Sequence, residues 1–278
     1  MELETINNFE VKPIKIPALP SLENIAGSVL FPAMYINCFL CAKKNSGKTV
    51  ALSNIIFKSI NKKTSLIFFV STASKDSTYQ SIFDRLDEKD INYSVYNDIY
   101  IDGVNIIDKL IDGLLIADPE VKNHKREDSK KKEKPLVYNL FDTPDMKEAE
   151  EVKEKKIKKK APKYIIVIDD MSNETRNPCI ARLLKIHRHL KASVFISSQN
   201  CNDLTPSAFR QLDYLLIFRG LSNNIEKLTQ IHSNMDLPIE LDTFIEVYRD
   251  ATMEPYNFLW CSKDGSFRKN FNKKYILQ

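Results

Sequence analysis

Residues 42–49 bring together the residue types that bind a triphosphate. They read Ala-Lys-Lys-Asn-Ser-Gly-Lys-Thr, and they lie between an apolar run, residues 34–41, and an amphipathic stretch, residues 50–60. A strand, a tight loop ending in Gly-Lys-Thr and a helix form the context of a phosphate-binding loop. Backbone N–H groups at such a turn, together with the helix dipole, attract an anion to one place. We therefore expect a nucleotide to bind here.

Individual loop residues have distinct expected roles. Lys48 can reach the β- and γ-phosphates, and Thr49 can offer its hydroxyl to Mg²⁺. The usual pattern, G-x-x-x-x-G-K-[ST], begins with glycine, and this sequence has Ala42 instead. Alanine opposes a positive φ angle only mildly, so we expect the loop to keep its shape. The residues expected to surround the phosphates are Ala42, Lys43, Lys44, Asn45, Ser46, Gly47, Lys48, Thr49 and Val50.

Two further apolar runs end in polar residues. Asp169 and Asp170 follow Ile165–Ile168, and Gln199 follows residues 192–198. Such runs suit strands buried on both faces of a parallel sheet. We expect Asp169 to hold Mg²⁺ through water opposite Thr49, and Asp170 to polarise the attacking water. If residues 192–198 lie between the other two strands, Gln199 would sit beside the γ-phosphate. The alternative is that all three residues merely end strands.

The remaining pattern predicts the elements that position these residues. Strands are expected at 64–70, 92–96 and 213–218, and helices at 79–86, 105–116, 178–190, 206–212, 223–232 and 238–249. Residues 256–261 and 266–271 suggest a closing β-hairpin. This order predicts an α/β fold with a central, mostly parallel sheet flanked by helices. Residues 1–33, which hold four prolines, are predicted to form an extended arm before a single domain, residues 34–278.

Composition narrows the class of protein. Of 278 residues, 43% are apolar and 28% charged, which is ordinary for a globular protein. No run of eighteen apolar residues predicts a transmembrane helix, and the polar N-terminus argues against a secretory signal. The five cysteines are an odd number, and the Cys38–Cys41 spacing lies inside one strand. Buried thiols in a reducing compartment are therefore expected.

The net charge of +4 is concentrated in one segment. Residues 120–163 hold fifteen Lys or Arg and ten Asp or Glu, a balance of +5, whereas the other residues sum to −1. One interpretation of this insertion is a solvated, mobile loop, because blocks of like charge repel. The other is a lysine-rich flap that contacts nucleic acid phosphates.

The segments AKKNSGKT, YIIVIDD, SVFISSQ and LTPSAFRQLDYLLIFRG together resemble the FtsK–HerA superfamily of DNA-pumping ATPases. Within it, the sequence is most similar to genome-packaging ATPases of nucleocytoplasmic large DNA viruses and virophages, over roughly residues 34–262. The resemblance implies a P-loop NTPase fold of the RecA-like ASCE type, with ATP and Mg²⁺ at the carboxyl ends of the strands. It also implies a homo-oligomeric ring around double-stranded DNA, capsid or internal membrane proteins as partners, and a location in the host cytoplasm or the virion.

The resemblance also assigns roles to residues. Asp169 matches the Walker B carboxylate, Asp170 the water-activating acid and Gln199 the sensor of the γ-phosphate. Arg210 resembles an arginine finger, which would reach the γ-phosphate of a neighbouring subunit. A planar guanidinium suits that role, because charge in the transition state spreads over equatorial oxygens. The catalytic set implied is Lys48, Asp170, Gln199 and Arg210, the metal set is Thr49 and Asp169, and Arg188 and Arg219 compete with Arg210.

Three functions follow from these patterns. The first is an ATP-hydrolysing motor that moves double-stranded viral DNA into a capsid. The second is a small-molecule kinase or a nucleotide-dependent switch, since the same loop serves those chemistries. No N-K-x-D stretch is present to recognise guanine, and the charged insertion has only Arg126 where a kinase lid would be rich in arginine. The third, a DNA-binding protein without enzymatic activity, leaves Asp169 and Asp170 unexplained.

Overall fold

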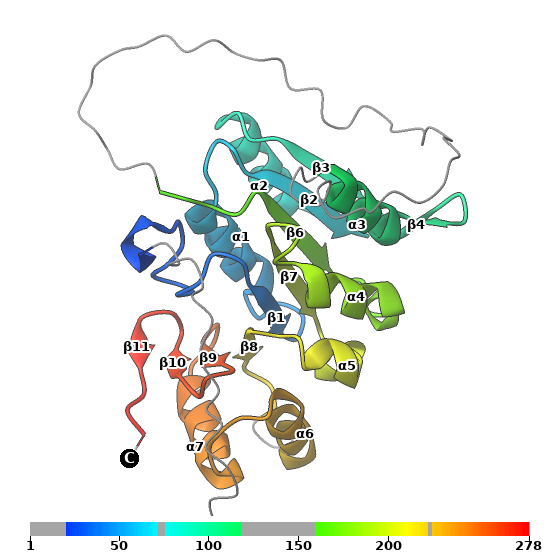
Figure 1. The fold of residues 1–278 in the computed structure, drawn as a ribbon. Coiled ribbons are helices and arrows are strands. Elements are labelled where there is room, and N and C mark those ends of the chain that lie inside the picture. The colour runs from blue at the N-terminus through cyan, green and yellow to red at the C-terminus, as the bar shows by residue number, and fades with distance from the viewer. Residues whose placement is uncertain (1–20, 72–75, 118–158, 222–223, 278) are drawn as a thin grey trace, which may run out of the picture.

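The computed structural model describes residues 21–71, 76–117, 159–221 and 224–277 (Figure 1). Six strands run parallel to one another: β1 (Asn37–Cys41), β2 (Ser65–Val70), β3 (Tyr93–Tyr96), β6 (Tyr164–Asp169), β7 (Ala192–Ser198) and β8 (Tyr214–Phe218). Three antiparallel strands extend the sheet: β9 (Phe258–Ser262), β10 (Phe267–Lys269) and β11 (Lys273–Lys274). The strand order is β11-β10-β9-β8-β1-β7-β6-β2-β3.

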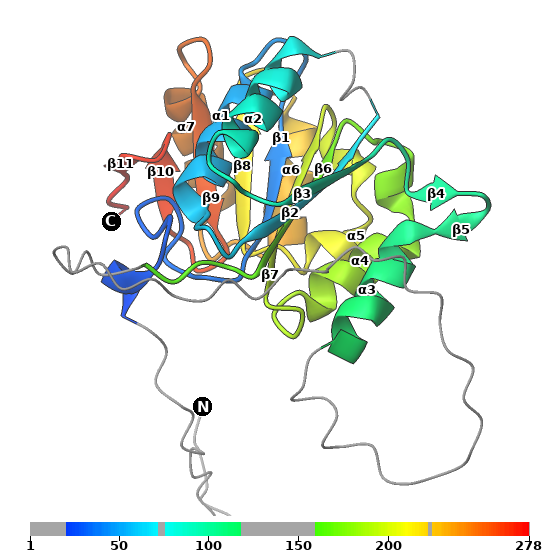
Figure 2. The same cartoon turned by 90° about the horizontal axis from the view of Figure 1, so that it is seen from above.

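Helices cover both faces of this sheet (Figure 2). One face packs against α1 (Lys48–Ser59) and α2 (Ser77–Asp87). The opposite face packs against α3 (Ile106–Ala117), α4 (Pro178–Ile186), α5 (Pro206–Phe209), α6 (Ile225–Met235) and α7 (Leu241–Ala251). The predicted α/β class, with a mostly parallel sheet and a C-terminal β-hairpin, is therefore confirmed.

The apolar runs form strands because both faces of the sheet are covered. Every residue of β1, β6, β7 and β8 is buried. Side chains three residues apart on a strand point to opposite faces. Cys38 packs accordingly with the α1 side of the sheet and Cys41 with the α4 side. All five cysteines are buried and free, as predicted.

Local capping chemistry sets several helix starts. The Asn177 side chain accepts a hydrogen bond from the Cys179 N–H at 3.0 Å, and Pro178 occupies the first turn of α4. Thr205 caps α5 in the same way. The predicted end of α4 near residue 190 is wrong, because the helix stops at Ile186 and residues 187–190 form turns. Lys191, with φ of 54°, then leads the chain into β7.

Residues 21–33 differ from the extended arm that the sequence predicts. They form a 3₁₀ helix (Leu22–Asn24) followed by turns, and Ile25 pairs with Lys160 in an isolated parallel bridge. Phe31 explains the difference, because its buried ring lies 4.9 Å from the ring of Tyr214, centroid to centroid, and anchors the segment to the sheet. Residues 1–20 and 120–158 lie outside the described residues.

A second, two-stranded sheet was not predicted. It is the hairpin of β4 (Tyr100–Ile101) and β5 (Val104–Asn105), and its turn contains Asp102 and Gly103, both with positive φ. An Asp-Gly pair is a strong hairpin signal, so the sequence did contain this information. The hairpin leads directly into α3.

Candidate nucleotide-binding site

The loop between β1 and α1 has the backbone shape that anion binding requires. Gly47 caps α1 with φ of 84°, and Asn45 has φ of 63°. Both angles lie in the left-handed region, which glycine and asparagine tolerate best. Ala42 has no positive φ, and its N–H donates to the Ser198 carbonyl at 3.0 Å. The missing first glycine is therefore compatible with this loop.

The loop opens onto a cleft of about 670 Å³ at the carboxyl ends of the parallel strands. It is lined by Lys43, Lys44, Asn45, Ser46, Gly47, Lys48, Thr49, Val50, Asp76, Ser77, Thr78, Asp169, Asp170 and Gln199. The cavity thus brings together Asp169, Asp170, Gln199 and the predicted phosphate loop. Ala42 is the one predicted loop residue that does not line it. Three of the lining residues were not predicted, and they belong to the start of α2.

Lys48 and Asp169, 121 positions apart, meet inside this cleft. The Lys48 Nζ atom lies 2.9 Å from Asp169 Oδ1 and 3.9 Å from Asp170 Oδ1. The side chains of Lys48 and Asp169 are 12% and 4% exposed, so their charges interact in a poorly hydrated place. In this state Lys48 supplies one positive charge beside the two carboxylates.

Two hydroxyl groups fix the orientation of Asp169. Tyr79 on α2 donates to Oδ2 at 2.6 Å, and Ser197 on β7 donates to Oδ1 at 2.5 Å. Burial, followed by the charge and hydrogen bond of Asp169, raises the pKa of Tyr79 well above its usual value. Tyr79 therefore stays protonated and donates at any physiological pH. The sequence pattern placed Tyr79 on a helix but gave no sign of this contact.

Asp170 and Gln199 lie together at the mouth of the cleft. The Gln199 Nε2 atom donates to Asp170 Oδ1 at 3.0 Å. Asp170 has φ of 55°, an angle that aspartate tolerates, and this sharp bend lets both consecutive carboxylates approach Lys48. The contact depends on β7 lying between β1 and β6, which is the strand order that the role of Gln199 required.

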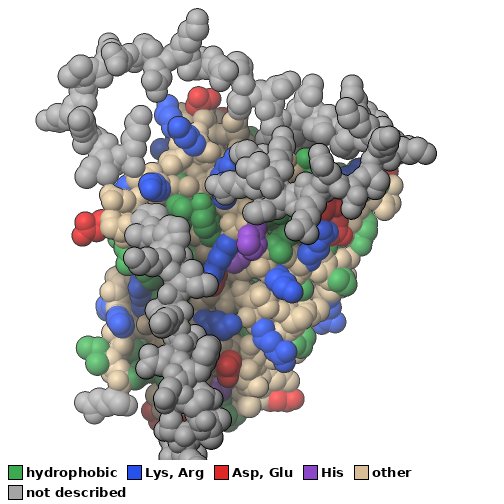
Figure 3. All heavy atoms as spheres, viewed as in Figure 1, with side chains coloured by type: hydrophobic (Ala, Val, Ile, Leu, Met, Phe, Trp, Pro, Cys, Tyr) green, Lys and Arg blue, Asp and Glu red, His purple; other side chains and the backbone are tan. Residues whose placement is uncertain are grey.

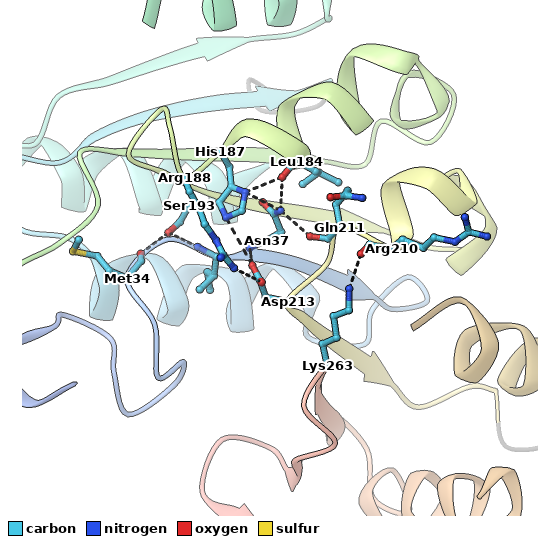
Figure 4. A network of polar contacts seen from close by, with 11 residues as sticks. Met34, Asn37, Leu184, His187, Arg188, Ser193, Arg210, Gln211, Asp213 and Lys263 are labelled. Atoms are coloured by element: carbon cyan, nitrogen blue, oxygen red, sulfur yellow. Dashed lines mark hydrogen bonds and ion pairs between the residues drawn. The ribbon is translucent and has the colours of Figure 1, made fainter. Parts of the chain in front are cut away.

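The three candidate arginines occupy two different edges of the sheet. Arg219 directly follows β8 and lies at the same edge as the cleft. Arg210 and Arg188 precede β8 and β7, so they lie at the opposite edge (Figure 4). Arg188 pairs with Asp213 at 2.9 Å. The structure does not bring Arg210 into its own subunit's cleft, and its action on a neighbouring subunit stays a prediction.

A buried polar network holds that opposite edge together (Figure 4). The Asn37 Nδ2 group contacts the Leu184 carbonyl at 2.7 Å, the Gln211 carbonyl at 2.8 Å and His187 Nδ1 at 3.0 Å. Burial lowers the pKa of His187, although the Leu184 carbonyl and Asp213 oppose this shift. These contacts tie α4 to the starts of β1 and β8, so the network is structural.

The start of α2 is the part of the site that the sequence analysis missed. Asp76 caps this helix by accepting from the Thr78 N–H at 2.8 Å, which turns Ser77 and Thr78 toward the cleft. An Asp-Ser-Thr stretch before an amphipathic helical pattern is a typical N-cap signal, so the sequence does indicate where α2 begins. Among the described residues, no group of three or more His, Cys, Asp or Glu could hold a metal. Within the same residues, none of the helices has the length and apolarity to span a bilayer.

Solved structures of low sequence identity resemble this chain. The genome packaging NTPase B204 of Sulfolobus turreted icosahedral virus 2, in complex with AMP, is 16% identical, with a TM-score of 0.48 over 88% of this chain and 98% of that one. The cytoplasmic domain of the type VII secretion ATPase EccC of Thermomonospora curvata is 12% identical, with a TM-score of 0.44 over 83% of this chain and 24% of that one. No curated protein matches the sequence.

A family profile gives the decisive comparison. The profile described as "Poxvirus A32 protein" matches residues 121–272, which are 152 of the 278 residues. The matched region contains Asp169, Asp170 and Gln199, and the phosphate loop precedes it. The chain therefore belongs to the Poxvirus A32 protein family, which confirms the viral ATPase resemblance identified from its motifs.

Proposed function

We propose that this protein hydrolyses ATP to drive double-stranded viral DNA into a capsid. The observation that carries the proposal is the convergence of Lys48, Asp169 and Asp170 on one cleft beside a phosphate-type loop. The loop and the α1 N-terminus supply backbone N–H groups and a favourable dipole for the triphosphate. Lys48 would leave Asp169 to contact the β- and γ-phosphates.

The residues present fit Mg²⁺ held largely through water. Asp169 accepts hydrogen bonds from Tyr79 and Ser197, so its oxygens are oriented, and each keeps part of its capacity to accept. Mg²⁺ usually keeps several waters and takes other ligands from substrate phosphates. Thr49 and Asp169 would hold the ion, which supplies charge neutralisation for the phosphates.

Asp170 and Gln199 are placed to handle the attacking water. Asp170 is the more exposed of the two carboxylates, and the Gln199 amide donates to it at 3.0 Å. A water bound between the two would be oriented by the amide and would give its proton toward the carboxylate. Gln199 follows β7, which lies between β1 and β6. A movement of the loop after β1 or after β6 would therefore also change the surroundings of Gln199.

A basic face supports DNA as the partner. Exposed lysines and arginines gather where the parallel strands begin, and Figure 3 shows such side chains collected on one face. We call this set the amino-end edge: Lys62, Lys63, Lys159, Lys160, Lys163, Lys185, Arg188, Arg210 and Lys263. From β2 to β8 the edge spans four strand spacings, roughly 19 Å. Duplex DNA carries roughly eleven phosphate charges over that length.

The wider assembly is part of the same proposal. A ring of identical subunits would present the amino-end edge, or the charged insertion, repeatedly to one duplex. It would also let Arg210, Arg188 or Arg219 act on the neighbour's nucleotide. Capsid or internal membrane proteins would dock the motor, and packaging would take place in the infected cell as virions assemble.

The test is the ATPase rate with and without double-stranded DNA, measured together with the assembled mass. We expect DNA to raise the rate, and Lys48→Ala to lower it on the order of a hundredfold or more. Lys58→Ala is the matched control, because Lys58 is an exposed lysine on the last turn of the same helix. Phosphate transfer to a small acceptor without DNA would instead favour a kinase, and full activity of Lys48→Ala would refute the site.

A further inference from the structure

Tyr256 stands out on the C-terminal side of the fold. It lies in the turn before β9, the residue is 69% exposed, and its φ angle is 64°. A bulky residue in the left-handed region is strained, and such strain persists only where surrounding contacts hold it. An exposed aromatic ring gains little from burial here. Its position therefore calls for another explanation.

The ring of Tyr256 lies over the phosphate loop. A Cβ atom added at Gly47 would be 3.4 Å from Tyr256 Cδ1 and 3.8 Å from its Cβ. Residues 47 and 256 are thus in contact range although they are 209 positions apart. Gly47 caps the helix that would receive the phosphates. The Tyr256 side chain therefore lies next to the residue that caps this helix, at the edge of the expected triphosphate position.

The strand order places Tyr256 on the correct side of that position. Asp169 and Gln199 follow β6 and β7, which lie on one side of β1. Tyr256 precedes β9, which lies beyond β8 on the other side of β1. A triphosphate that lies along the loop with its γ-phosphate facing Asp169 would extend its nucleoside end away from β6. The nucleoside then reaches the β8–β9 side of the loop, where the Tyr256 ring lies.

Hydrogen bonds hold the turn that carries Tyr256. The Asn257 Nδ2 group donates to Glu254 at 3.1 Å, and the Asn270 Nδ2 group donates to the Asn257 side chain at 2.9 Å. Asn270 also accepts from the Phe258 N–H at 3.1 Å. These bonds fix the chain on both sides of Tyr256. The backbone that carries the Tyr256 ring is therefore positioned before any ligand arrives, which reduces the ordering cost of binding.

We propose that Tyr256 is the stacking platform for the purine base of the nucleoside triphosphate, a proposal that rests on the function proposed above. The contact is through a ring face, so it selects a planar base and not a particular pattern of hydrogen bonds. Val50 and Met253, 58% and 67% exposed, add apolar surface on α1 and on the same turn as Tyr256. A bound base would cover this apolar surface, and its burial would contribute favourable free energy to binding.

The experiment compares two ligands that share phosphates and differ in the base. ATP and inorganic triphosphate are each titrated, with Mg²⁺, into the full-length wild type, Tyr256→Ala and Tyr256→Phe. We expect Tyr256→Ala to weaken ATP binding about tenfold, the usual scale for losing one base–aromatic stack. Affinity for triphosphate should not change, and Tyr256→Phe should match the wild type for both ligands. Tyr100→Ala, which removes a half-exposed tyrosine on the separate β4–β5 hairpin, is the control.

A third variant separates folding from binding. Tyr256→Gly suits a positive φ angle, so it should leave the fold as stable as the wild type or more stable, yet weaken ATP binding as Tyr256→Ala does. Equal affinity of all variants for ATP, or an equal loss for ATP and triphosphate, would overturn the base assignment. A wild type that binds neither ligand would instead refute the proposed nucleotide site itself.

Discussion

Replacing Tyr79 by phenylalanine removes a single oxygen atom from the site and tests how Asp169 is held. The phenol donates at 2.6 Å to a carboxylate whose side chain is only 4% exposed. Phenylalanine keeps the ring, which packs in the buried cluster under α2, so no large cavity forms. What is lost is one of three groups that compensate the Asp169 charge, the others being Lys48 and Ser197.

The expected loss of stability depends on how deeply the hydrogen bond between Tyr79 and Asp169 is buried. A hydrogen bond to a charged group contributes about 1.5–3 kcal/mol, and less where water can replace it. For a chain of this size each kcal/mol shifts the melting temperature by roughly 2–4 °C, so a loss of about 1.5–3 kcal/mol predicts a fall of about 3–12 °C. Loss of a bond that orients a metal ligand typically lowers metal affinity or activity about tenfold or more. The Mg²⁺ concentration needed for half-maximal ATPase activity should rise accordingly.

Tyr93→Phe is the matched control for this experiment. Tyr93 also donates to an aspartate, Asp87, but at 3.3 Å and in an exposed place. Water can replace that bond, so the same atomic deletion should leave both melting temperature and Mg²⁺ dependence nearly unchanged. Thermal unfolding and Mg²⁺ titrations of the two variants side by side make the comparison. If Tyr79→Phe behaves like Tyr93→Phe, the argument that buried donors position Asp169 is wrong.

Two further predictions concern the opposite edge of the sheet. Burial lowers the pKa of His187, so between its normal value near 6.5 and the lower folded value the unfolded chain binds the extra proton. The free energy of unfolding should therefore fall as pH drops below about 6.5. His187→Asn should reduce the difference in this free energy between pH 7 and pH 5, as measured by urea unfolding. Lys62→Glu with Lys63→Glu should weaken DNA binding and reduce its salt dependence in titrations of a labelled duplex. The same change at Lys273 and Lys274, on edge strand β11, should do neither, and an equal effect at both places would refute the amino-end edge.

The sequence was informative wherever function depends on local pattern. The phosphate loop, the strand before Asp169 and the cap at Asn177 are each encoded within a few neighbouring residues. The role predicted for Gln199 depends on one more fact, the order of the strands. The pattern at 192–198 indicated only that this strand is buried. The structure supplies that order, with β7 between β1 and β6.

Other parts of the site could not be derived because they depend on distant contacts or on strain. Tyr79 contacts Asp169 across 90 positions, and in the sequence it is simply one apolar residue of an amphipathic helix. Tyr256 has a φ angle that its residue type disfavours, so local preference argues against the observed shape. The sequence favoured Arg210 as the arginine finger, with Arg188 and Arg219 as competitors. Only the direction of the strands shows that Arg219 shares an edge with the cleft and that Arg210 does not.

We infer that the pairing of Lys48 with Asp169 would link nucleotide binding to metal binding. Lys48 lies 2.9 Å from Asp169, and it cannot hold this contact while it neutralises the phosphates. A triphosphate that took Lys48 alone would leave Asp169 buried, with two hydroxyl donors but no full countercharge. Breaking a buried pair in this way costs several kcal/mol, on the order of 3–5. A divalent cation that arrives with the phosphates restores the charge balance, so nucleotide and metal should bind together and not in sequence.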